Sequence, residues 1–272
     1  MILKFLKKLT EYRISHKNKK INVLKTFPLF ESHGWGNKSK RTKLTIQSIN
    51  QVIPGLSKFT FLSEENRNFK KQIEKFLVTT AEKEVLANLF NKYGSDKSNQ
   101  HNYHLIYSSI LNPKKDIKKI FEIGLGTNYP EIVSTMGSDG KPGASLKAFR
   151  DYCANCIVYG ADYDKRILFK DERIKTFFVD QTSPSTFDQL DENIGNDFDL
   201  MIDDGLHSPN ANLHSLYFFI KKLRVGGYGV IEDISPLTQN LWKIVTDLLK
   251  ENFLSALIET KNSSIFIIKR VN

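Results

Sequence analysis

The sequence has few cysteines and no long apolar segment. Its 272 residues include two cysteines, Cys153 and Cys156, which are too few for a disulfide framework, so we expect a reduced, cytoplasmic setting. No run of about 18 apolar residues is present, and we therefore expect no transmembrane helix. The start, MILKFLKKLTEYRI, is basic, but its lysines interrupt it too often for the apolar core of a signal peptide.

Two nucleotide-binding motifs are also missing. In EIGLG, Gly124 and Gly126 follow an apolar run, but the next glycine of a dinucleotide fingerprint would fall at Tyr129. The phosphate loop with its Gly-Lys-Ser/Thr is absent as well. NAD, and ATP or GTP bound through such a loop, are therefore disfavoured. The spacing in CANC, residues 153–156, occurs in redox and zinc motifs, but a single pair favours two buried thiols.

Acidic residues are scarce near the N-terminus. Residues 1–50 contain 12 Lys/Arg and only Glu11 and Glu31, a net charge of +10 that equals the net charge of the whole chain. We expect residues 1–80 to form a basic, partly helical extension, with apolar side chains on one face of a helix over residues 2–14. Such a segment is either a solvated tail or a surface that meets anionic lipid, nucleic acid or an acidic partner.

The rest of the chain, residues 81–272, is expected to form one α/β domain. A helix is predicted from Ser63, within the extension, and another from a capping box of Thr79 and Glu82 to Gly94. From residue 118 onward strands and helices alternate, which predicts a Rossmann-like, doubly wound, mostly parallel sheet of seven strands with a closing antiparallel hairpin. The strands are expected in KKIFEIGLG, IVYGADYD, IKTFFVDQ, FDLMIDDG, YGVIEDIS, SALIET and SIFIIKRV, and the helices in GASLKAFRDYCANC, NANLHSLYFFIKKLRVGG and LTQNLWKIVTDLLKEN.

Acids or glycines end each of the five strands expected to be parallel. Ligands of such sheets bind beyond the carboxyl ends of the strands, so these groups should gather at one edge. Glycines after the first strand let a ligand approach the backbone. Asp162 can accept both hydroxyls of a ribose, and Asp180 with Gln181 can lie beside an adenine. Together they favour a nucleoside site over solvated loop residues.

A second group of polar residues lies in DLMIDDGLHSPN and VIEDI. Asp204, Glu232 and Asp233 follow two neighbouring strands and form a hard oxygen site suited to Mg²⁺. His207 comes three residues after Asp204, close enough to act as a general base. The alternative is an ordinary polar loop.

Several stretches resemble a known family. FEIGLG, GADYD and VDQ are similar to the cofactor motifs of class I S-adenosylmethionine-dependent methyltransferases. YGSDKSNQHNYHLIY, GASLKAFRDY, IDDGLH and GGYGVIEDIS resemble the metal-dependent sugar O-methyltransferases, which methylate deoxysugars of macrolide and related antibiotics and have relatives in polysaccharide gene sets. The resemblance covers about residues 86–240.

The resemblance implies a role for individual residues. His207 would be the general base, and Asp204, Glu232 and Asp233 the metal ligands. The cofactor would be bound by Glu122, Gly124, Gly126, Ser145, Asp162, Asp180, Gln181 and Asp203. Apart from the resemblance, we expect lid or acceptor contacts from Ser95, Lys97, His101 and Tyr103. For the HNYHLIY segment, in which His101, Tyr103 and Tyr107 could close over cofactor or acceptor, the alternative is packing of a helix. The family's Gly-Thr-Asp-Lys is here Gly94 to Lys97 with serine as its second residue, and a second histidine of some relatives is replaced by Ala211.

We therefore expect methyl transfer from S-adenosylmethionine to a sugar hydroxyl, assisted by Mg²⁺ or Mn²⁺. A nucleotide-linked sugar for capsule or another surface polysaccharide is the preferred acceptor, because the basic segment can meet its diphosphate. A catechol-like or other small natural product is the alternative acceptor. A nucleic-acid-binding module is disfavoured, since few aromatics interleave the basic residues. We also expect a homo-oligomer, in the cytoplasm, with peripheral contact at the inner membrane face through the basic N-terminus.

Overall fold

The computed structural model describes residues 23–31 and 37–272. The helix predicted over residues 2–14 lies outside these residues. The chain divides into two compact units, Met1–Thr60 and Phe61–Asn272. In the first unit, helix α2 (Lys38–Leu56) begins after Asn37, whose side chain accepts a hydrogen bond of 2.8 Å from the backbone N–H of Ser39.

The second unit contains a sheet and seven helices. Its strands are β1 (Lys119–Ile123), β2 (Ile157–Asp162), β3 (Lys170–Asp171), β4 (Ile174–Phe178), β5 (Phe198–Asp203), β6 (Leu223–Ile231), β7 (Phe253–Glu259) and β8 (Ser264–Arg270). Its α-helices are α3 (Glu64–Phe76), α4 (Ala81–Tyr93), α5 (Tyr103–Ile110), α6 (Ala144–Tyr152), α7 (Pro184–Ile194), α8 (Pro209–Lys222) and α9 (Gln239–Leu249).

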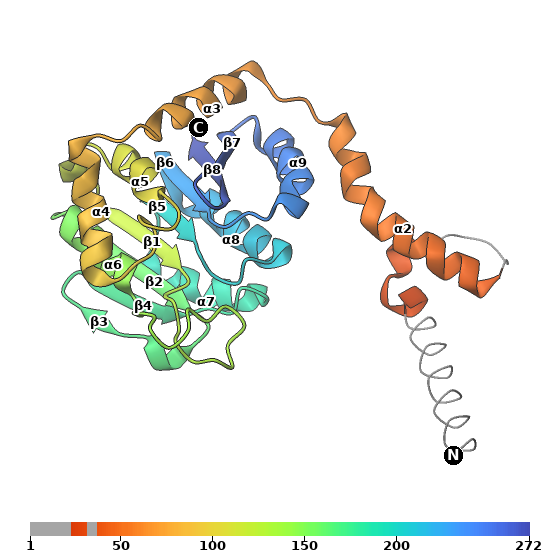
Figure 1. Ribbon diagram of the computed structural model, residues 1–272, viewed down its shortest axis with the longest axis horizontal. Coiled ribbons are helices and arrows are strands. Elements are labelled where there is room, and N and C mark those ends of the chain that lie inside the picture. The colour runs from red at the N-terminus through yellow and green to blue at the C-terminus, as the bar shows by residue number, and fades with distance from the viewer. Residues whose placement is uncertain (1–22, 32–36) are drawn as a thin grey trace, which may run out of the picture. The chain divides into compact units, whose positions relative to one another are not determined.

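The strands form one sheet in the order β3-β4-β2-β1-β5-β6-β8-β7 (Figure 1). Strands β4, β2, β1, β5 and β6 are parallel, and β7 and β8 form the predicted antiparallel hairpin at one edge. The mostly parallel, doubly wound sheet is thus confirmed, but the predicted count of seven strands is wrong. The eighth strand, β3, has two exposed residues and pairs antiparallel with β4, so it is too short to show a periodic pattern.

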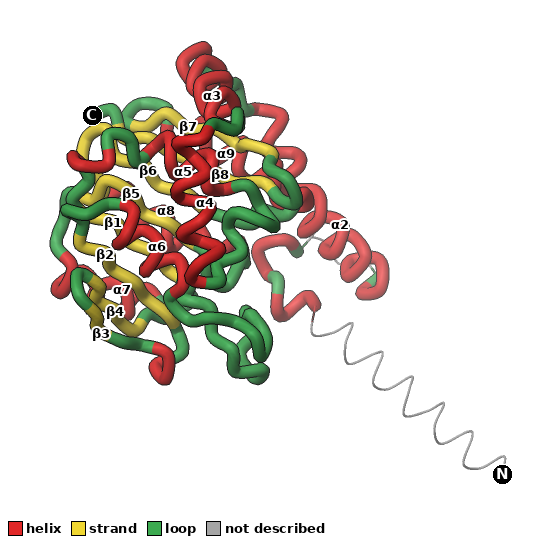
Figure 2. The backbone as a smooth tube through the Cα atoms, turned by 60° about the vertical axis from the view of Figure 1, so that its left-hand side comes forward, coloured by secondary structure: helices red, strands yellow, loops and turns green. Residues whose placement is uncertain are grey.

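Helices cover both faces of the sheet (Figure 2). On one face, Ile120 and Val158 pack with residues of α3, α4, α5 and α6. On the other face, Phe121 and Tyr159 pack with residues of α7, α8 and α9. Neighbouring residues of β1 and β2 thus serve opposite cores, as the two-residue repeat of a strand requires.

Local signals set several helix ends as predicted. Ser63 caps α3 by accepting a hydrogen bond of 3.1 Å from the Asn66 N–H, and Gly94 ends α4 with φ +84°. The capping box predicted at Thr79 is wrong, because α4 begins after Thr80 without a side-chain cap bond. The helix predicted to run to Gly226 and Gly227 ends at Lys222, and the following residues enter β6, where they pair with β5.

Residues 61–80, assigned to the extension from the sequence, pack with the sheet. The Oδ1 atom of Asn66 in α3 accepts a hydrogen bond of 2.8 Å from the backbone N–H of Ser255 in β7. Phe69 and Ile73 on the same helix are buried. The compact unit that carries the site therefore begins at Phe61. Among the described residues, no helix combines the length and apolar character needed to cross a bilayer.

Candidate active site

A cavity of about 640 Å³ lies at the carboxyl ends of β1, β2, β4 and β5. This is the edge of a doubly wound sheet at which ligands bind, and the volume suits a cofactor-sized molecule. Six of the eight predicted cofactor residues line it: Gly124, Gly126, Ser145, Asp162, Asp180 and Gln181. The structure thus brings most of the predicted cofactor residues together.

The two glycines after β1 allow close backbone approach. Gly124 and Gly126 have φ values of +91° and +79°, which a residue with a Cβ atom rarely adopts. A Cβ atom at Gly124 would overlap the carbonyl oxygen of Asp204, and one at Gly126 would overlap the sulfur of Met136. Gly124 therefore lets the end of β1 lie directly against the segment that carries Asp204.

Asp162, at the end of β2, shapes the same turn. Its Oδ2 atom accepts a hydrogen bond of 2.7 Å from the Leu125 N–H, and its Oδ1 atom accepts one of 2.8 Å from the Asp164 N–H. Burial raises the pKa of Asp162, although these backbone N–H groups partly oppose the rise. The carboxylate lines the cavity with lone pairs left to accept hydroxyl groups.

Glu122 and Asp203 lie beneath the cavity rather than in its lining. Glu122 is fully buried and accepts a hydrogen bond of 2.6 Å from Ser145. Asp203 is also buried, and accepts hydrogen bonds from Gln181 at 2.8 Å and from Asn212 at 3.0 Å. Because neither residue lines the cavity, the geometry does not favour direct contact of Glu122 or Asp203 with the cofactor. They hold residues that do line the cavity.

Lys97 lies at the centre of the buried charges. Its Nζ atom is 2.6 Å from Asp204 Oδ2, 2.6 Å from Glu232 Oε2 and 3.1 Å from Glu122 Oε1, and its side chain is 2% exposed. Burial alone would lower the pKa of Lys97, but the three carboxylates outweigh it and raise the pKa well above its ordinary value. Lys97 therefore stays protonated and joins the ends of β1, β5 and β6.

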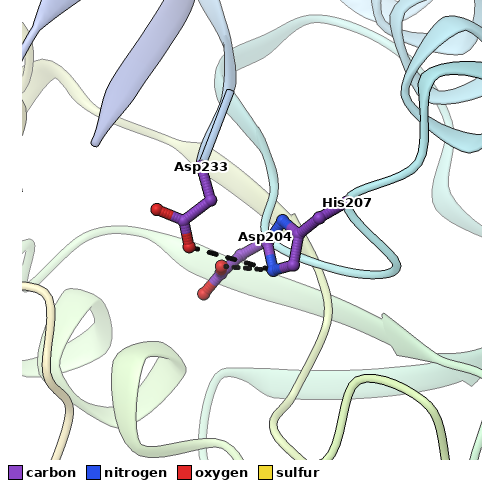
Figure 3. Close-up of side chains that lie close together, drawn as sticks. All are labelled: Asp204, His207 and Asp233. Atoms are coloured by element: carbon purple, nitrogen blue, oxygen red, sulfur yellow. Dashed lines mark ion pairs between the residues drawn. The ribbon is translucent and has the colours of Figure 1, made fainter. Parts of the chain in front are cut away.

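Three side chains, one of them also a partner of Lys97, form a group that can hold a metal ion. The group consists of Asp204, His207 and Asp233, and it has one ligand atom of each residue within 4.8 Å of the other two (Figure 3). His207 Nε2 lies 3.7 Å from Asp204 Oδ1 and 3.9 Å from Asp233 Oδ2. His207 and Asp233 have φ values of +54° and +53°, which are uncommon without glycine and occur at functional sites.

Glu232, a predicted metal ligand, is not part of this group. One of its oxygens contacts Lys97, and the other accepts a hydrogen bond from the hydroxyl of Tyr107. Burial, followed by repulsion from Asp204, raises the pKa of Glu232 well above its ordinary value. Both oxygens of Glu232 are therefore engaged in the interior of this structure, and its role as a third metal ligand stays a prediction.

The four predicted lid or acceptor residues divide into two pairs. Ser95 and Lys97 line the cavity but are buried, so the structure does not support a lid role for them. His101 and Tyr103 lie next to Asp233 instead of in the cavity lining. The Tyr103 hydroxyl donates a hydrogen bond of 2.7 Å to Asp233 Oδ1, and His101 Nδ1 lies 3.6 Å from the same oxygen.

Sequence reasoning missed the loop between β1 and α6. Its residues Ile132, Val133 and Met136 line the cavity, and Val133 is 88% exposed. The loop is held by Arg166, which pairs with Glu131 at 2.6 Å and lies over the ring of Tyr129. The loop has no periodic pattern, so only its position after EIGLG would have pointed to it.

The residues present fit both groups that the resemblance implies. Two carboxylate oxygens and an imidazole nitrogen within 4.8 Å of one another are ligands that a divalent ion accepts. Asp162, the glycine turn and the apolar loop fit a nucleoside with a methionine-like tail. The described interior is rich in carboxylates, with Lys97 the cation that contacts three of them, so a bound cation would offset excess negative charge.

The relatives found by sequence comparison are named as sugar O-methyltransferases. No family model matches the chain. Over 165 residues it is 29% identical to the 8-demethyl-8-α-L-rhamnosyl tetracenomycin-C 2′-O-methyltransferase of Streptomyces olivaceus, which covers 60% of this chain and 41% of the relative. Over 158 residues it is 31% identical to the L-olivosyl-oleandolide 3-O-methyltransferase of Streptomyces antibioticus, which covers 57% of this chain and 38% of the relative.

A solved structure shares the fold. The MycE methyltransferase from the mycinamycin biosynthetic pathway, in complex with Mg and SAH, has a TM-score of 0.56 and 22% identity over 69% of this chain and 55% of MycE. The chain thus matches less than half of each sequence relative and about half of MycE. The sequence thus resembles relatives named as sugar O-methyltransferases, and the fold resembles that of MycE.

Proposed function

We propose that the protein transfers a methyl group from S-adenosylmethionine to a hydroxyl of a sugar, with Mg²⁺ or Mn²⁺ bound by Asp204 and Asp233 and with His207 as the base. The observation that carries the proposal is the convergence of Asp204, His207 and Asp233 in the lining of the cavity that the predicted cofactor residues also line. Relatives named as sugar O-methyltransferases, and MycE with Mg and SAH, support it.

The chain's residues divide the chemistry between them. S-adenosylmethionine supplies an activated methyl group, and a bound divalent ion makes the proton of a nearby hydroxyl easier to remove. Asp204 and Asp233 would hold the ion through carboxylate oxygens, because Mg²⁺ prefers oxygen ligands. His207 Nε2 faces both oxygens and accepts the hydroxyl proton. The walls of the cavity align the acceptor oxygen with the methyl group.

The relatives' names and the charge of this chain favour different sugar acceptors. The relatives' names describe sugars joined to tetracenomycin and oleandolide, whereas the excess of positive charge near the N-terminus favours a nucleotide-linked sugar for a surface polysaccharide. A methyl-transfer assay with nucleotide sugars, glycosylated aglycones and catechols separates these classes. Transfer to catechols alone would overturn the assignment of a sugar acceptor. Transfer to none of the three would exclude all three classes as acceptors.

We propose in addition that the basic segment meets an anionic membrane surface. Residues 23–31 and 37–60, the described part of the first unit, contain one acid, Glu31, which pairs with Arg41. Leu29 and Phe59 expose 87% and 77% of their surfaces, a combination of cations and apolar groups that suits anionic lipid. Co-sedimentation with phosphatidylserine vesicles at low salt supports this, and equal binding to neutral vesicles would contradict it. The other basic residues described there are Lys25, Lys38, Lys40, Lys43 and Lys58.

A further inference from the structure

We infer that Lys97 and Tyr103 are positioning residues that hold Asp204 and Asp233 so that each carboxylate turns a single oxygen toward the metal ion. This inference rests on the proposed function, because it concerns the ion that Asp204 and Asp233 would bind. It goes further by giving roles to two side chains expected from the sequence to contact the acceptor or close over it.

The carboxylate of Asp204 has two different neighbours. Its Oδ2 atom is 2.6 Å from Lys97 Nζ, at a side chain that is 2% exposed. Its Oδ1 atom is 3.7 Å from His207 Nε2. Lys97 also contacts Glu122 and Glu232 and cannot swing away without leaving those buried carboxylates unpaired. Asp204 is therefore fixed with Oδ1 toward His207.

Asp233 repeats the arrangement with a neutral donor. Its Oδ1 atom accepts a hydrogen bond of 2.7 Å from the Tyr103 hydroxyl, and its Oδ2 atom is 3.9 Å from His207 Nε2. Tyr103 is 1% exposed, and its ring stacks on His101 with a centroid distance of 4.9 Å. The Tyr103 hydroxyl therefore engages Oδ1 of Asp233 and leaves Oδ2 facing His207.

Both positioning residues come from outside the strands that carry the carboxylates. Lys97 follows α4 and Tyr103 begins α5, whereas Asp204 and Asp233 follow β5 and β6. Groups that orient metal ligands commonly lie in such a second layer, and their loss lowers metal affinity about 10- to 100-fold. The stretch from Lys97 to Tyr103 thus orients the residues that would bind the metal ion.

Tyr107 supplies a matched control on the same helix. It lies one turn after Tyr103 in α5, is also buried, and donates to Glu232 instead of Asp233. Tyr103→Phe and Tyr107→Phe each remove one buried hydroxyl. A loss that is merely structural would affect both variants alike, whereas a positioning role affects Tyr103 alone.

The test is Mn²⁺ binding by the cofactor-free, full-length protein, followed through the electron paramagnetic resonance signal of free Mn²⁺. We expect Tyr103→Phe to weaken binding about 10-fold or more, with Tyr107→Phe unchanged. Equal affinity of wild type and Tyr103→Phe would overturn the inference while leaving the metal site of the proposed function intact. An equal loss in Tyr107→Phe would overturn it too, and would support Glu232 as a metal ligand.

Failure of the wild type to bind Mn²⁺ would remove the metal site itself and the inference with it. For Lys97, Lys97→Met separates positioning from charge. Removing a positive charge would strengthen cation binding by Coulomb attraction, whereas loss of the anchor weakens it. Weaker Mn²⁺ binding supports the role of Lys97, and tighter binding would overturn it. If circular dichroism shows that Lys97→Met is unfolded, the Tyr103 and Tyr107 pair decides the inference.

Discussion

The ammonium group of Lys97 lies 2.6 Å from a carboxylate oxygen of Asp204, although the two residues are 107 positions apart in the sequence. The contact ties the segment after α4 to the end of β5. It also engages one oxygen of Asp204 and leaves the other facing His207. The charge of the interior and the direction of the candidate metal ligand thus depend on the same lysine.

Asp204→Asn should reduce methyl transfer by more than the roughly 10- to 100-fold typical of changes outside the ligand shell. The amide keeps the shape of the side chain but removes the charge that would hold the ion. Higher Mg²⁺ should restore part of the rate, which initial rates over a magnesium series measure. Asp188→Asn, on the exposed side of α7, is the matched control. Equal rates in the two variants would exclude Asp204 as a ligand.

His207→Ala should lower turnover about 10²- to 10⁴-fold, the usual contribution of a general base. Mn²⁺ binding should persist, because the two carboxylate oxygens remain. Raising the pH should recover part of the rate, since the acceptor hydroxyl then loses its proton more readily without help. Loss of Mn²⁺ binding in this variant would instead make His207 a ligand, and full turnover would move the base elsewhere.

Asp162→Ala should weaken binding of S-adenosylhomocysteine about 10- to 100-fold, since hydrogen bonds to a charged group contribute about 1.5–3 kcal/mol. Isothermal titration calorimetry measures the affinity, and the wild type should not bind NADH. The exposed Asp188→Ala serves as the control. Tight NADH binding without binding of S-adenosylhomocysteine would contradict the cofactor assignment.

Two truncations test where the catalytic unit begins. A chain starting at Phe61 should fold and bind S-adenosylhomocysteine, because Phe61–Asn272 forms a compact unit. A chain starting at Ala81 lacks α3 and its buried Phe69 and Ile73, which should cost about 3–6 kcal/mol of the free energy of unfolding. Thermal melting compares them. Equal stability of the two chains would restore the boundary at residue 80.

The sequence was most informative where a local pattern has one physical meaning. Parallel strands buried on both faces and ending in acids predicted the sheet and the edge that carries the cavity. The buried, free thiols of Cys153 and Cys156 were predicted from their spacing and context, and burial raises the pKa of Cys153 to about 12. Such features depend on residues that are neighbours in the chain or on strands in a regular sheet.

Contacts between segments that are distant in the sequence were harder to predict. Glu232 and Asp233 are adjacent and both acidic, yet only Asp233 faces His207. The difference arises from Lys97 and Tyr107, which approach from before β1 and engage Glu232. Side-chain direction at the end of a strand was thus decided by tertiary partners. The two-residue strand β3 and the loop over the cavity escaped prediction because neither has a repeat.

The most direct test of the proposed chemistry is transfer of labelled methyl from S-adenosylmethionine to a sugar acceptor, with and without a chelator. We predict transfer to a hydroxyl of the sugar, loss of the rate when divalent ions are removed, and recovery when Mg²⁺ or Mn²⁺ is restored. An undiminished rate in the chelator would contradict the account, since Asp204, His207 and Asp233 would then be a polar rim of the cofactor cavity and not a metal centre.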